Sequence, residues 1–361
     1  MLSVLFYLTL YFIVFTIQIF AMKQKNEKAR TFFALASFAL ILAMIGLRSS
    51  VGTDYDSYAS SFYNFTKLSF TEAWHTAGDV GTKLIFWISS HIFTSARSVF
   101  WIYGMLSLYP IYKINKKSRF QYLAYTTLIY NFLILPASLN IIRQGAALSF
   151  ILLAFFEIKE KPEKLLLPII CVLVAIALHT SSLIMVPYLV AYIFAKKKSR
   201  KYWPFAIIIT LAIAASFLTF LKSILQRIGF TEYDYQLAIK SGISISASYL
   251  VTTLLNLVPI ILSYLAQDKK QKEEHEDILA LSLSGIIFEV VGTSFQYLSR
   301  ISFFFTIFQI LLTPKLIQNI KDKKVRMMLK IIIIVSLSII FIWRCGIMGK
   351  YGIIPYKTWL T

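Results

Sequence analysis

Residues 2–22 read LSVLFYLTLYFIVFTIQIFAM, and residues 23–30 read KQKNEKAR. The first stretch is apolar over about 20 residues, the length a helix needs to cross the hydrocarbon core of a bilayer. It lacks the basic start of a signal peptide, so we expect a retained membrane helix. The second stretch is a short basic loop. The same alternation of apolar span and linker continues along the chain.

Positive charge is concentrated in six linkers that together hold 25 of the 37 Lys and Arg residues. Linkers rich in Lys and Arg remain on the cytoplasmic side of a membrane. We therefore predict that these six are cytoplasmic and that both termini lie outside. The linkers are Lys23–Arg30, Lys113–Arg119, Lys159–Lys164, Lys196–Lys201, Lys269–Lys272 and Lys315–Lys330.

The apolar segments predict an all-α integral membrane protein with about 12 transmembrane helices in a single polytopic domain, residues 1–361. Two outer linkers, 48–96 and 222–247, are long enough to be functional. In the first, Leu84, Trp87, Ile88 and Ile92 share one helical face, which suits a helix in the outer interface. The expected spans are about 2–22, 31–47, 97–113, 120–136, 142–158, 165–179, 181–195, 203–221, 248–266, 278–297, 300–317 and 330–346.

Composition excludes several classes of protein. Apolar residues make up 58% of the chain, too many for a soluble globular protein. The net charge of +20 is spread over short loops, which suits an anionic inner leaflet and not a nucleic-acid groove. Cys171 and Cys345 lie in apolar runs, so neither a disulfide framework nor a metal–cysteine site is expected.

The first polar motif follows the second span and runs from Arg48 to Tyr58, with the sequence RSSVGTDYDSY. Gly52 permits a tight turn, and the next two side chains can bond the local backbone. Such a turn would hold the Arg48 guanidinium and the Asp54 carboxylate together at the outer face. The alternative is an arginine that snorkels at a helix end beside an ordinary polar turn.

The second motif is Asn140-Ile-Ile-Arg143-Gln144-Gly-Ala-Ala147. Its i, i+3, i+4 and i+7 spacing predicts that the four numbered residues share one helical face. A guanidinium binds phosphate with two parallel hydrogen bonds, which lysine cannot do as well. The alternative is that the amides form hydrogen bonds between neighbouring spans.

Two further motifs carry groups that can transfer protons. His179, in Leu-His-Thr-Ser181, can act as a general base near neutral pH or can be a neutral residue bonded to a carbonyl. Glu289 is a candidate proton carrier, base or arginine partner. It begins a stripe formed by Glu289, Thr293, Gln296 and Arg300. The tail from Gly349 to Tyr356 is expected outside, as a cap.

Arg48, Arg143 and Arg300 come from separate parts of the chain and all map to the outer face. Several guanidinium groups at one face predict a site for an anionic lipid substrate such as a polyprenyl diphosphate, because they stabilise the departing diphosphate. A hydroxyl acceptor would need a base, for which Asp54 and His179 are the two candidates.

In this order, the motifs resemble the EpsG family of Wzy-type polymerases of capsule, exopolysaccharide and O-antigen. The resemblance rests on Gly46-Leu-Arg48, Val-Gly52-Thr-Asp54-Tyr55, Asn140-Ile-Ile-Arg143-Gln144, Leu178-His179-Thr-Ser181 and Ser299-Arg300, with a tail ending in Pro355-Tyr356. It implies a GT-C-like bundle that joins repeat units carried on undecaprenyl diphosphate, without a metal or cofactor. The site would face outward from the bacterial cytoplasmic membrane. A flippase and a chain-length regulator would be partners.

We expect Arg143 and Arg300 to hold diphosphate with help from Arg48, and Tyr55 and Tyr58 to bind sugar. The other residues expected to line the site are Asn140, Gln144, Ser181, Glu289, Gln296 and Tyr356. A flippase or polysaccharide transporter is the alternative, but it would place cations through both halves of the membrane, often with repeat symmetry. An O-antigen ligase would have one dominant outer loop, and a membrane acyltransferase would have its polar site nearer the inner face.

Overall fold

The structure, a computed structural model, describes residues 2–198, 247–291 and 296–359. The secondary-structure elements in these ranges are helices. This confirms the all-helical prediction. Arg48 and Thr358 pair through an isolated antiparallel β-bridge. The chain divides into two compact units: unit 1 is Met1–Ser182 with Leu337–Thr361, and unit 2 is Leu183–Ser336.

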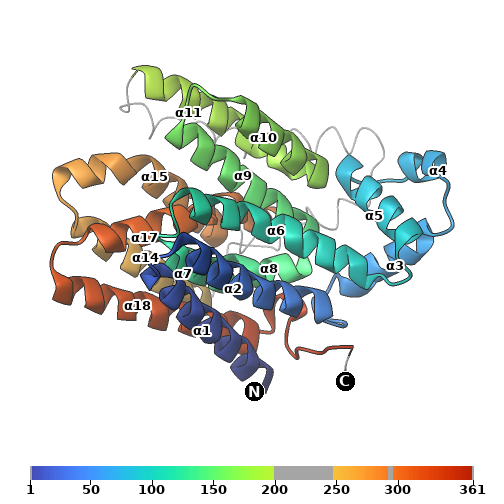
Figure 1. The fold of residues 1–361 in the computed structure, drawn as a ribbon, viewed down its shortest axis with the longest axis horizontal. Helices are drawn as coiled ribbons and strands as arrows, with labels where there is room; N and C mark the ends of the chain where they lie inside the picture. The colour runs from blue at the N-terminus through green and yellow to red at the C-terminus, as the bar shows by residue number, and fades with distance from the viewer. Residues whose placement is uncertain (1, 199–246, 292–295, 360–361) are drawn as a thin grey trace. The chain divides into compact units, whose positions relative to one another are not determined.

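Unit 1 is built around α9, whose side chains are apolar or small on nearly every face and are therefore almost all buried. Helices α6 and α10 pack against α9, and α1 packs against α2 (Figure 1). The helices of unit 1 are α1 Leu2–Lys23, α2 Glu27–Leu47, α3 Tyr55–Phe65, α4 Phe70–His75, α5 Val80–Ile92, α6 Arg97–Lys117, α7 Leu123–Ile129, a π-helical turn Tyr130–Ile134, α8 Leu135–Asn140, α9 Ile142–Glu160 and α10 Leu166–Leu178.

The basic linkers of unit 1 gather at one end of its helices. Arg30 Nη1 donates to the Arg119 carbonyl at 3.1 Å, and Lys117 forms an ion pair with Glu157. At the other end of the α1–α2 hairpin, the Tyr356 N–H donates to Ser3 Oγ at 3.0 Å. Both the start of the chain and its tail therefore lie opposite the basic linkers, as the sorting of charge predicts.

The long linker 48–96 folds into α3, α4 and α5, which lie together beyond the end of α2 in Figure 1. In α5, Leu84, Ile88 and Ile92 are exposed, as expected of an interfacial helix, whereas Trp87 is half-buried. With 13 residues, α5 is too short to cross a bilayer, because a helix rises only about 1.5 Å per residue. Gly81 lets α5 lie close to the Ala177 carbonyl of α10.

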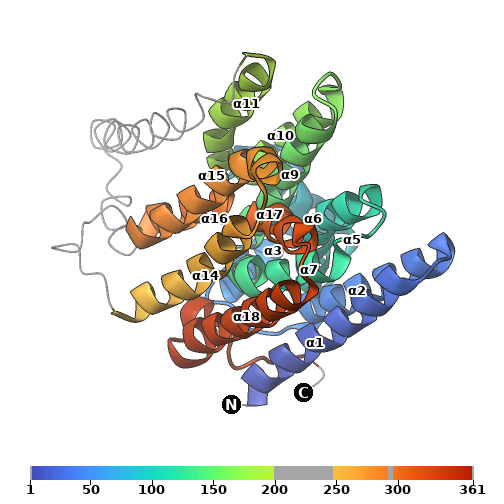
Figure 2. The same cartoon turned by 90° about the vertical axis from the view of Figure 1, so that its left-hand side faces the viewer.

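Unit 2 contains five helices that lie wholly within it among the described residues, and α15 packs against α16 (Figure 2). Gly285 allows this close packing, because a Cβ there would collide with the Thr306 backbone. Phe288 and Phe305 stack across the same pair, with ring centroids 5.1 Å apart. The five helices are α11 Val186–Lys198, α14 Ala247–Leu265, α15 Lys269–Val291, α16 Gln296–Thr306 and α17 Gln309–Asn319.

Helix α18, Lys323–Phe341, begins in unit 2 and ends in unit 1, and the π-helical turn Ile342–Ile347 extends it. Three helices of the described part of the chain are long and apolar enough to cross a membrane by length and composition: Leu2–Lys23, Glu27–Leu47 and Lys323–Ile347. The pair Ser299–Thr306 and Gln309–Asn319, bent by 40°, makes a fourth if it is one span. These helices fit a membrane protein. The count of about 12 stays a prediction, and the expected span 203–221 and loop 222–247 lie outside the described residues.

Candidate functional site

A carboxylate that the motifs did not indicate joins two of the predicted site residues. Arg143 Nη1 donates to Asp79 Oδ2 at 2.9 Å, and His179 Nδ1 lies 3.5 Å from the same oxygen. The Thr180 N–H donates to Asp79 Oδ1 at 2.9 Å, and the Thr180 hydroxyl donates to it as well. We call Asp79, Arg143, His179 and Thr180 the Asp79 cluster.

Three elements bring the Asp79 cluster together. Asp79 directly precedes α5, Arg143 lies in the first turn of α9, and His179 follows the last residue of α10. Because α10 packs against both α9 and α5, these ends meet at one place. Asp79 occupies the N-cap position of α5, yet its side chain makes no capping hydrogen bond. Its carboxylate instead reaches across to the other two helices.

The Asp79 cluster is charged and partly open to solvent. The side chains of Asp79, His179 and Arg143 are 10%, 21% and 32% exposed, respectively. Burial alone would raise the pKa of Asp79, which lies outside the predicted spans, but the nearby His179 ring and the hydrogen bonds from Thr180 lower that pKa to about 2. Asp79 is therefore an anion at neutral pH, beside an arginine that a ligand can reach.

Two tyrosines border the Asp79 cluster. The Tyr58 side chain on α3 is a second partner of Arg143. The Tyr103 hydroxyl on α6 lies 2.9 Å from Thr82 Oγ1, and Thr82 also donates to the Leu178 carbonyl at 3.1 Å. Polar groups from four helices therefore surround the arginine and the histidine.

The motif Gly52-Thr53-Asp54 forms a second polar region, a turn held by Asn140. Asn140 Oδ1 accepts hydrogen bonds from the Asp54 N–H at 2.8 Å and from Thr53 Oγ1 at 2.9 Å. The tail closes over the turn, because the Gly52 N–H donates to the Gly352 carbonyl at 2.9 Å. Gly52 has φ +100°, and a Cβ there would come within 2.9 Å of the Leu139 carbonyl. The first two sequence motifs therefore meet through Asn140.

Arg48 does not pair with Asp54, contrary to the expectation from the sequence. Its side chain is fully buried, and Nη1 donates to the carbonyls of Val51, at 3.2 Å, and Leu139. The guanidinium carbon lies 4.8 Å from the ring centroid of Phe100 and 5.7 Å from that of Tyr55. Backbone carbonyls and aromatic faces take the place of a carboxylate, because the Arg48 side chain turns inward from the end of α2.

The expectation of one helical face for Asn140, Arg143, Gln144 and Ala147 is wrong in part. Helix α8 ends at Asn140, Ile141 has φ −95° and ψ 66°, and α9 begins at Ile142. The chain folds tightly back here, because Gly145 lets Ser138 approach closer than any side chain would allow. The break separates Asn140, which binds the Thr53–Asp54 turn, from Arg143, which pairs with Asp79.

The remaining predicted residues of unit 1 lie in different surroundings. Tyr55 is buried and stacks on Phe100, with ring centroids 4.3 Å apart. Gln144 is buried on α9, and Ser181 is exposed directly beside the Asp79 cluster. The Tyr356 hydroxyl donates to the Met44 carbonyl at 2.8 Å, so the tail is fastened to α2.

The predicted residues of unit 2 lie on two neighbouring helices. Glu289 is buried on α15, and Arg300 is half-buried on α16. Gln296 is the first residue of α16, while Thr293 and the side chain of Gln296 lie outside the described residues. The stripe therefore does not follow a single helix. Convergence of Arg300 with Arg143 of unit 1 stays a prediction.

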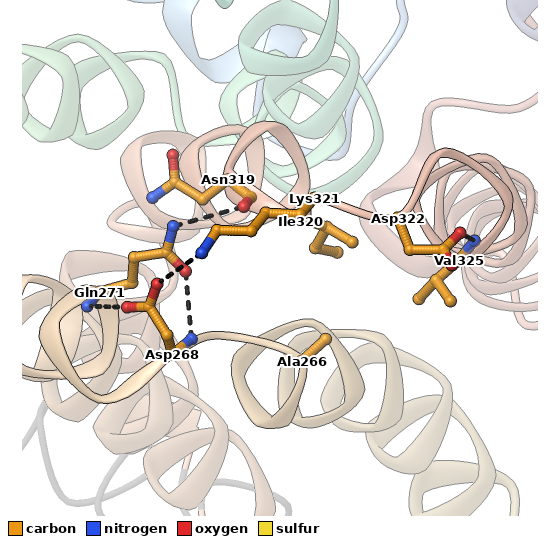
Figure 3. A pocket seen from close by; sticks show the side chains of 8 residues that line it. All are labelled: Ala266, Asp268, Gln271, Asn319, Ile320, Lys321, Asp322 and Val325. Atoms are coloured by element: carbon orange, nitrogen blue, oxygen red, sulfur yellow. Dashed lines mark hydrogen bonds and ion pairs between the residues drawn. The ribbon is translucent and has the colours of Figure 1, made fainter.

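Unit 2 also contains a pocket of about 240 Å³ (Figure 3), between the α14–α15 and α17–α18 linkers. Lys321 Nζ lies 3.5 Å from Asp268 Oδ2, and Gln271 Nε2 donates to the Asn319 carbonyl at 3.3 Å. The pocket lies among the basic linkers and includes none of the predicted site residues. It is lined by Ala266, Asp268, Gln271, Asn319, Ile320, Lys321, Asp322 and Val325.

Within the described ranges, no three His, Cys, Asp or Glu residues come together in a way that could hold a metal ion. The Asp79 cluster itself offers a guanidinium, a carboxylate, an imidazole and the Thr180 hydroxyl. A guanidinium binds anions, and an imidazole accepts or donates a proton.

Apolar helices of membrane-spanning length point to a membrane protein, and unit 1 holds an ion-paired polar cluster where three of its helix ends meet. The chain belongs to the EpsG family, whose profile matches residues 31–358. EpsG is a family of Wzy-type polysaccharide polymerases, so the resemblance of the motifs is confirmed over nearly the whole chain. No curated protein and no solved structure matches the chain.

Asp79 is the residue that the motifs missed. In the sequence it stands between Gly78 and the apolar start of α5, where an aspartate normally caps a helix. A usable signal was its place in the long polar linker 48–96, where a carboxylate can serve as counterion for an arginine at the same membrane face. Thr180, directly after His179, was within a quoted motif but had no role assigned to it.

Proposed function

We propose that this protein joins oligosaccharide repeat units carried on undecaprenyl diphosphate into a polysaccharide. The reaction takes place at the outer face of the bacterial cytoplasmic membrane, within a GT-C-like bundle of about 12 spans. Membership of the EpsG family supports a glycosyltransferase-type polymerase. The observation that carries the proposal is the Asp79 cluster, which sets a reachable arginine beside a histidine at the end of unit 1 opposite the basic linkers.

In the proposed reaction the growing chain on its lipid diphosphate is the donor. The acceptor is a hydroxyl at the non-reducing end of a new lipid-linked repeat unit. The hydroxyl oxygen bonds to the anomeric carbon of the donor, and the bond from that carbon to the diphosphate breaks. The hydroxyl proton passes to a base on the protein, and the polyprenyl diphosphate leaves with the bonding electrons. No nucleotide, metal ion or cofactor enters this balance.

The arginines stabilise the leaving group in this proposal, because negative charge develops on the diphosphate. Arg143, partly exposed, holds it together with Arg300 of α16. Arg48 assists through the turn that it fixes, because its guanidinium is fully buried. Asp54 and His179 are the two candidates for the base, and Tyr58 and Ser181, which lie beside the Asp79 cluster, are assigned to the sugar.

The test supplies the purified protein, in lipid nanodiscs, with a lipid-linked repeat unit alone. We expect a ladder of products spaced by whole repeat units, without nucleotide sugar, ATP or divalent metal. Asp56→Asn, which alters an exposed carboxylate of α3, is the matched control and should give the wild-type ladder. A protein that moves the lipid-linked unit across liposomes, yet never yields two joined repeat units, would be a transporter. A flippase and a chain-length regulator are the expected partners in the cell.

A further inference from the structure

We propose that Asp79 is a positioning residue that orients His179, so that His179 Nε2 takes the proton from the attacking sugar hydroxyl. This inference rests on the proposed function, because it names the base of that reaction. It selects His179 over Asp54 and gives a role to a carboxylate that the motifs did not indicate.

The first argument is the environment of the imidazole. His179 Nδ1 is buried and lies 3.5 Å from Asp79 Oδ2, and it makes no hydrogen bond of regular geometry with a described residue. A carboxylate facing Nδ1 favours the tautomer with its proton on that atom, so the lone pair is on Nε2. The main chain that carries the ring is also held, because the His179 N–H donates to the Ala175 carbonyl at 2.9 Å.

The second argument is that Asp79 is itself held rigidly. Oδ1 accepts from both the N–H and the hydroxyl of Thr180, while Oδ2 accepts from Arg143. With both oxygens engaged, the carboxylate cannot turn away from the imidazole. The low pKa of Asp79, about 2, makes it a poor base but keeps it anionic when His179 gains a proton.

The third argument is the spacing of the two functions. Asp79 Oδ2 faces Arg143 Nη1 at 2.9 Å and His179 Nδ1 at 3.5 Å, so one oxygen sets the distance between them. A guanidinium has five N–H donors, so Arg143 can serve Asp79 and Tyr58 and still bind an anion. Asp79 therefore places the group that takes the proton beside the group that holds the leaving diphosphate.

Asp54 lacks such a pairing. Its carboxylate accepts from Thr53 Oγ1 at 3.3 Å, and no ion pair joins it to a cation among the described residues. Its backbone N–H is bound by Asn140, which makes it part of the turn. The groups that face Asp79 are Arg143, His179 and Thr180, with the hydroxyls of Tyr58 and Tyr103 nearby.

The decisive variant is Asp79→Asn. Thr180 donates twice to Oδ1, so the amide oxygen of the variant takes that place and the amide NH2 takes the place of Oδ2. The NH2 then donates to His179 Nδ1, which moves the imidazole proton to Nε2 and blocks the base. The NH2 cannot accept from Arg143 Nη1, so the variant also loses that ion pair, and the tautomer measured below separates the two effects. We expect kcat to fall by about 100-fold or more, the contribution of a general base, while KM for the lipid-linked unit changes little.

A second measurement reports the tautomer without using activity. The chain has 4 histidines, so nitrogen NMR of protein labelled in histidine is tractable, and His179→Gln identifies the signal. We expect neutral His179 to carry its proton on Nδ1 in the wild type and on Nε2 in Asp79→Asn. Asp56→Asn should leave both the spectrum and kcat unchanged.

Asp79→Glu covers the case in which Asp79→Asn fails to accumulate. It keeps the negative charge, so we expect His179 to have the wild-type tautomer. The loss of kcat in Asp79→Glu should be at least tenfold smaller than the loss in Asp79→Asn. If Asp79→Asn does not accumulate, His179→Gln is the variant used for this comparison.

An unchanged tautomer in Asp79→Asn, or a loss that appears only in KM, would overturn the inference while the wild-type ladder still supports the polymerase. A wild-type protein that extends no lipid-linked substrate would overturn the proposed function, and the role of His179 as base with it.

Discussion

Arg48 and Arg143 are both arginines at helix ends beside polar motifs, yet the structure gives them opposite surroundings. Arg48 is fully buried, bonded to backbone carbonyls and covered by the rings of Tyr55 and Phe100. Arg143 is 32% exposed and ion-paired with Asp79. The first arginine has nowhere to receive a ligand, whereas the second has both a fixed position and an open side. Exposure to solvent, and not charge alone, is therefore why the proposed function gives the diphosphate contact to Arg143 and not to Arg48.

The surroundings of Arg48 explain only in part how a buried cation is tolerated without a carboxylate, because Nε and Nη2 have no hydrogen-bond partner among the described residues. Hydrogen bonds from a charged group contribute about 1.5–3 kcal/mol each, and a desolvated cation–π contact contributes about 2 kcal/mol. These contacts join the end of α2 to the end of α8 through the Leu139 carbonyl. The Arg48 backbone also pairs with Thr358 of the tail. Arg48 therefore holds three separate segments together.

The largest expected effect is the loss of stability in Arg48→Ala. Removing the side chain leaves two buried carbonyls without a donor and a cavity between two rings, so we expect a loss of about 3–5 kcal/mol. Unfolding in mixed detergent micelles measures it. Arg48→Met keeps the volume and should lose less. If Arg48→Ala is as stable as the wild type but inactive, Arg48 contacts substrate and its contrast with Arg143 fails.

Arg143→Lys should have the reverse profile, with normal accumulation and poor activity. Lysine keeps the charge but lacks the planar guanidinium that forms two parallel hydrogen bonds to the diphosphate. Losing a contact worth about 1.5–3 kcal/mol should slow the reaction by about one to two decades. The yield and length distribution of the polymer measure it. Arg300→Lys should behave alike if both arginines hold diphosphate. Wild-type polymer from Arg143→Lys would show that its role is to join helices.

The contrast between the two arginines also shows what the sequence could predict. The apolar lengths of 2–22 and 31–47 predicted α1 and α2, because a bilayer sets the length of a span. The basic linkers predicted which helix ends gather together in unit 1. Whether an arginine at a helix end turns inward depends on the rings beside it. Phe100 is 52 positions away from Arg48 in the sequence, so no local pattern indicates their contact.

Two other features depend on contacts between distant segments. The break at Ile141 has no proline or glycine at the break itself, so the local pattern favoured Asn140 and Arg143 on one face of the same helix. The close approach of Ser138 to Gly145 determines it instead. Asp79 stands where an aspartate caps a helix, and only the packing of α5 against α10 reveals that its carboxylate serves Arg143.

Asn140→Ala has the smallest expected effect and tests how strongly the two arginine regions are coupled. Asn140 follows Leu139, whose carbonyl binds Arg48, and precedes Arg143 by three positions. Its Oδ1 accepts two hydrogen bonds from the Thr53–Asp54 turn, each contributing about 0.5–1.5 kcal/mol net. We expect Asn140→Ala to lose about 1–2 kcal/mol of stability, because the turn loosens while the Arg48 contacts remain.

Activity of Asn140→Ala should fall only a few-fold, because Arg143, Asp79 and His179 are held by α9, α5 and α10 and not by Asn140. Comparing Arg48→Ala, Asn140→Ala and the double variant in one unfolding assay measures the coupling. If the two losses add, the turn and Arg48 act independently. If Asn140→Ala instead loses as much activity as Arg143→Lys without losing stability, the Asn140 amide contacts substrate, and the region that binds sugar extends from the Asp79 cluster to the turn.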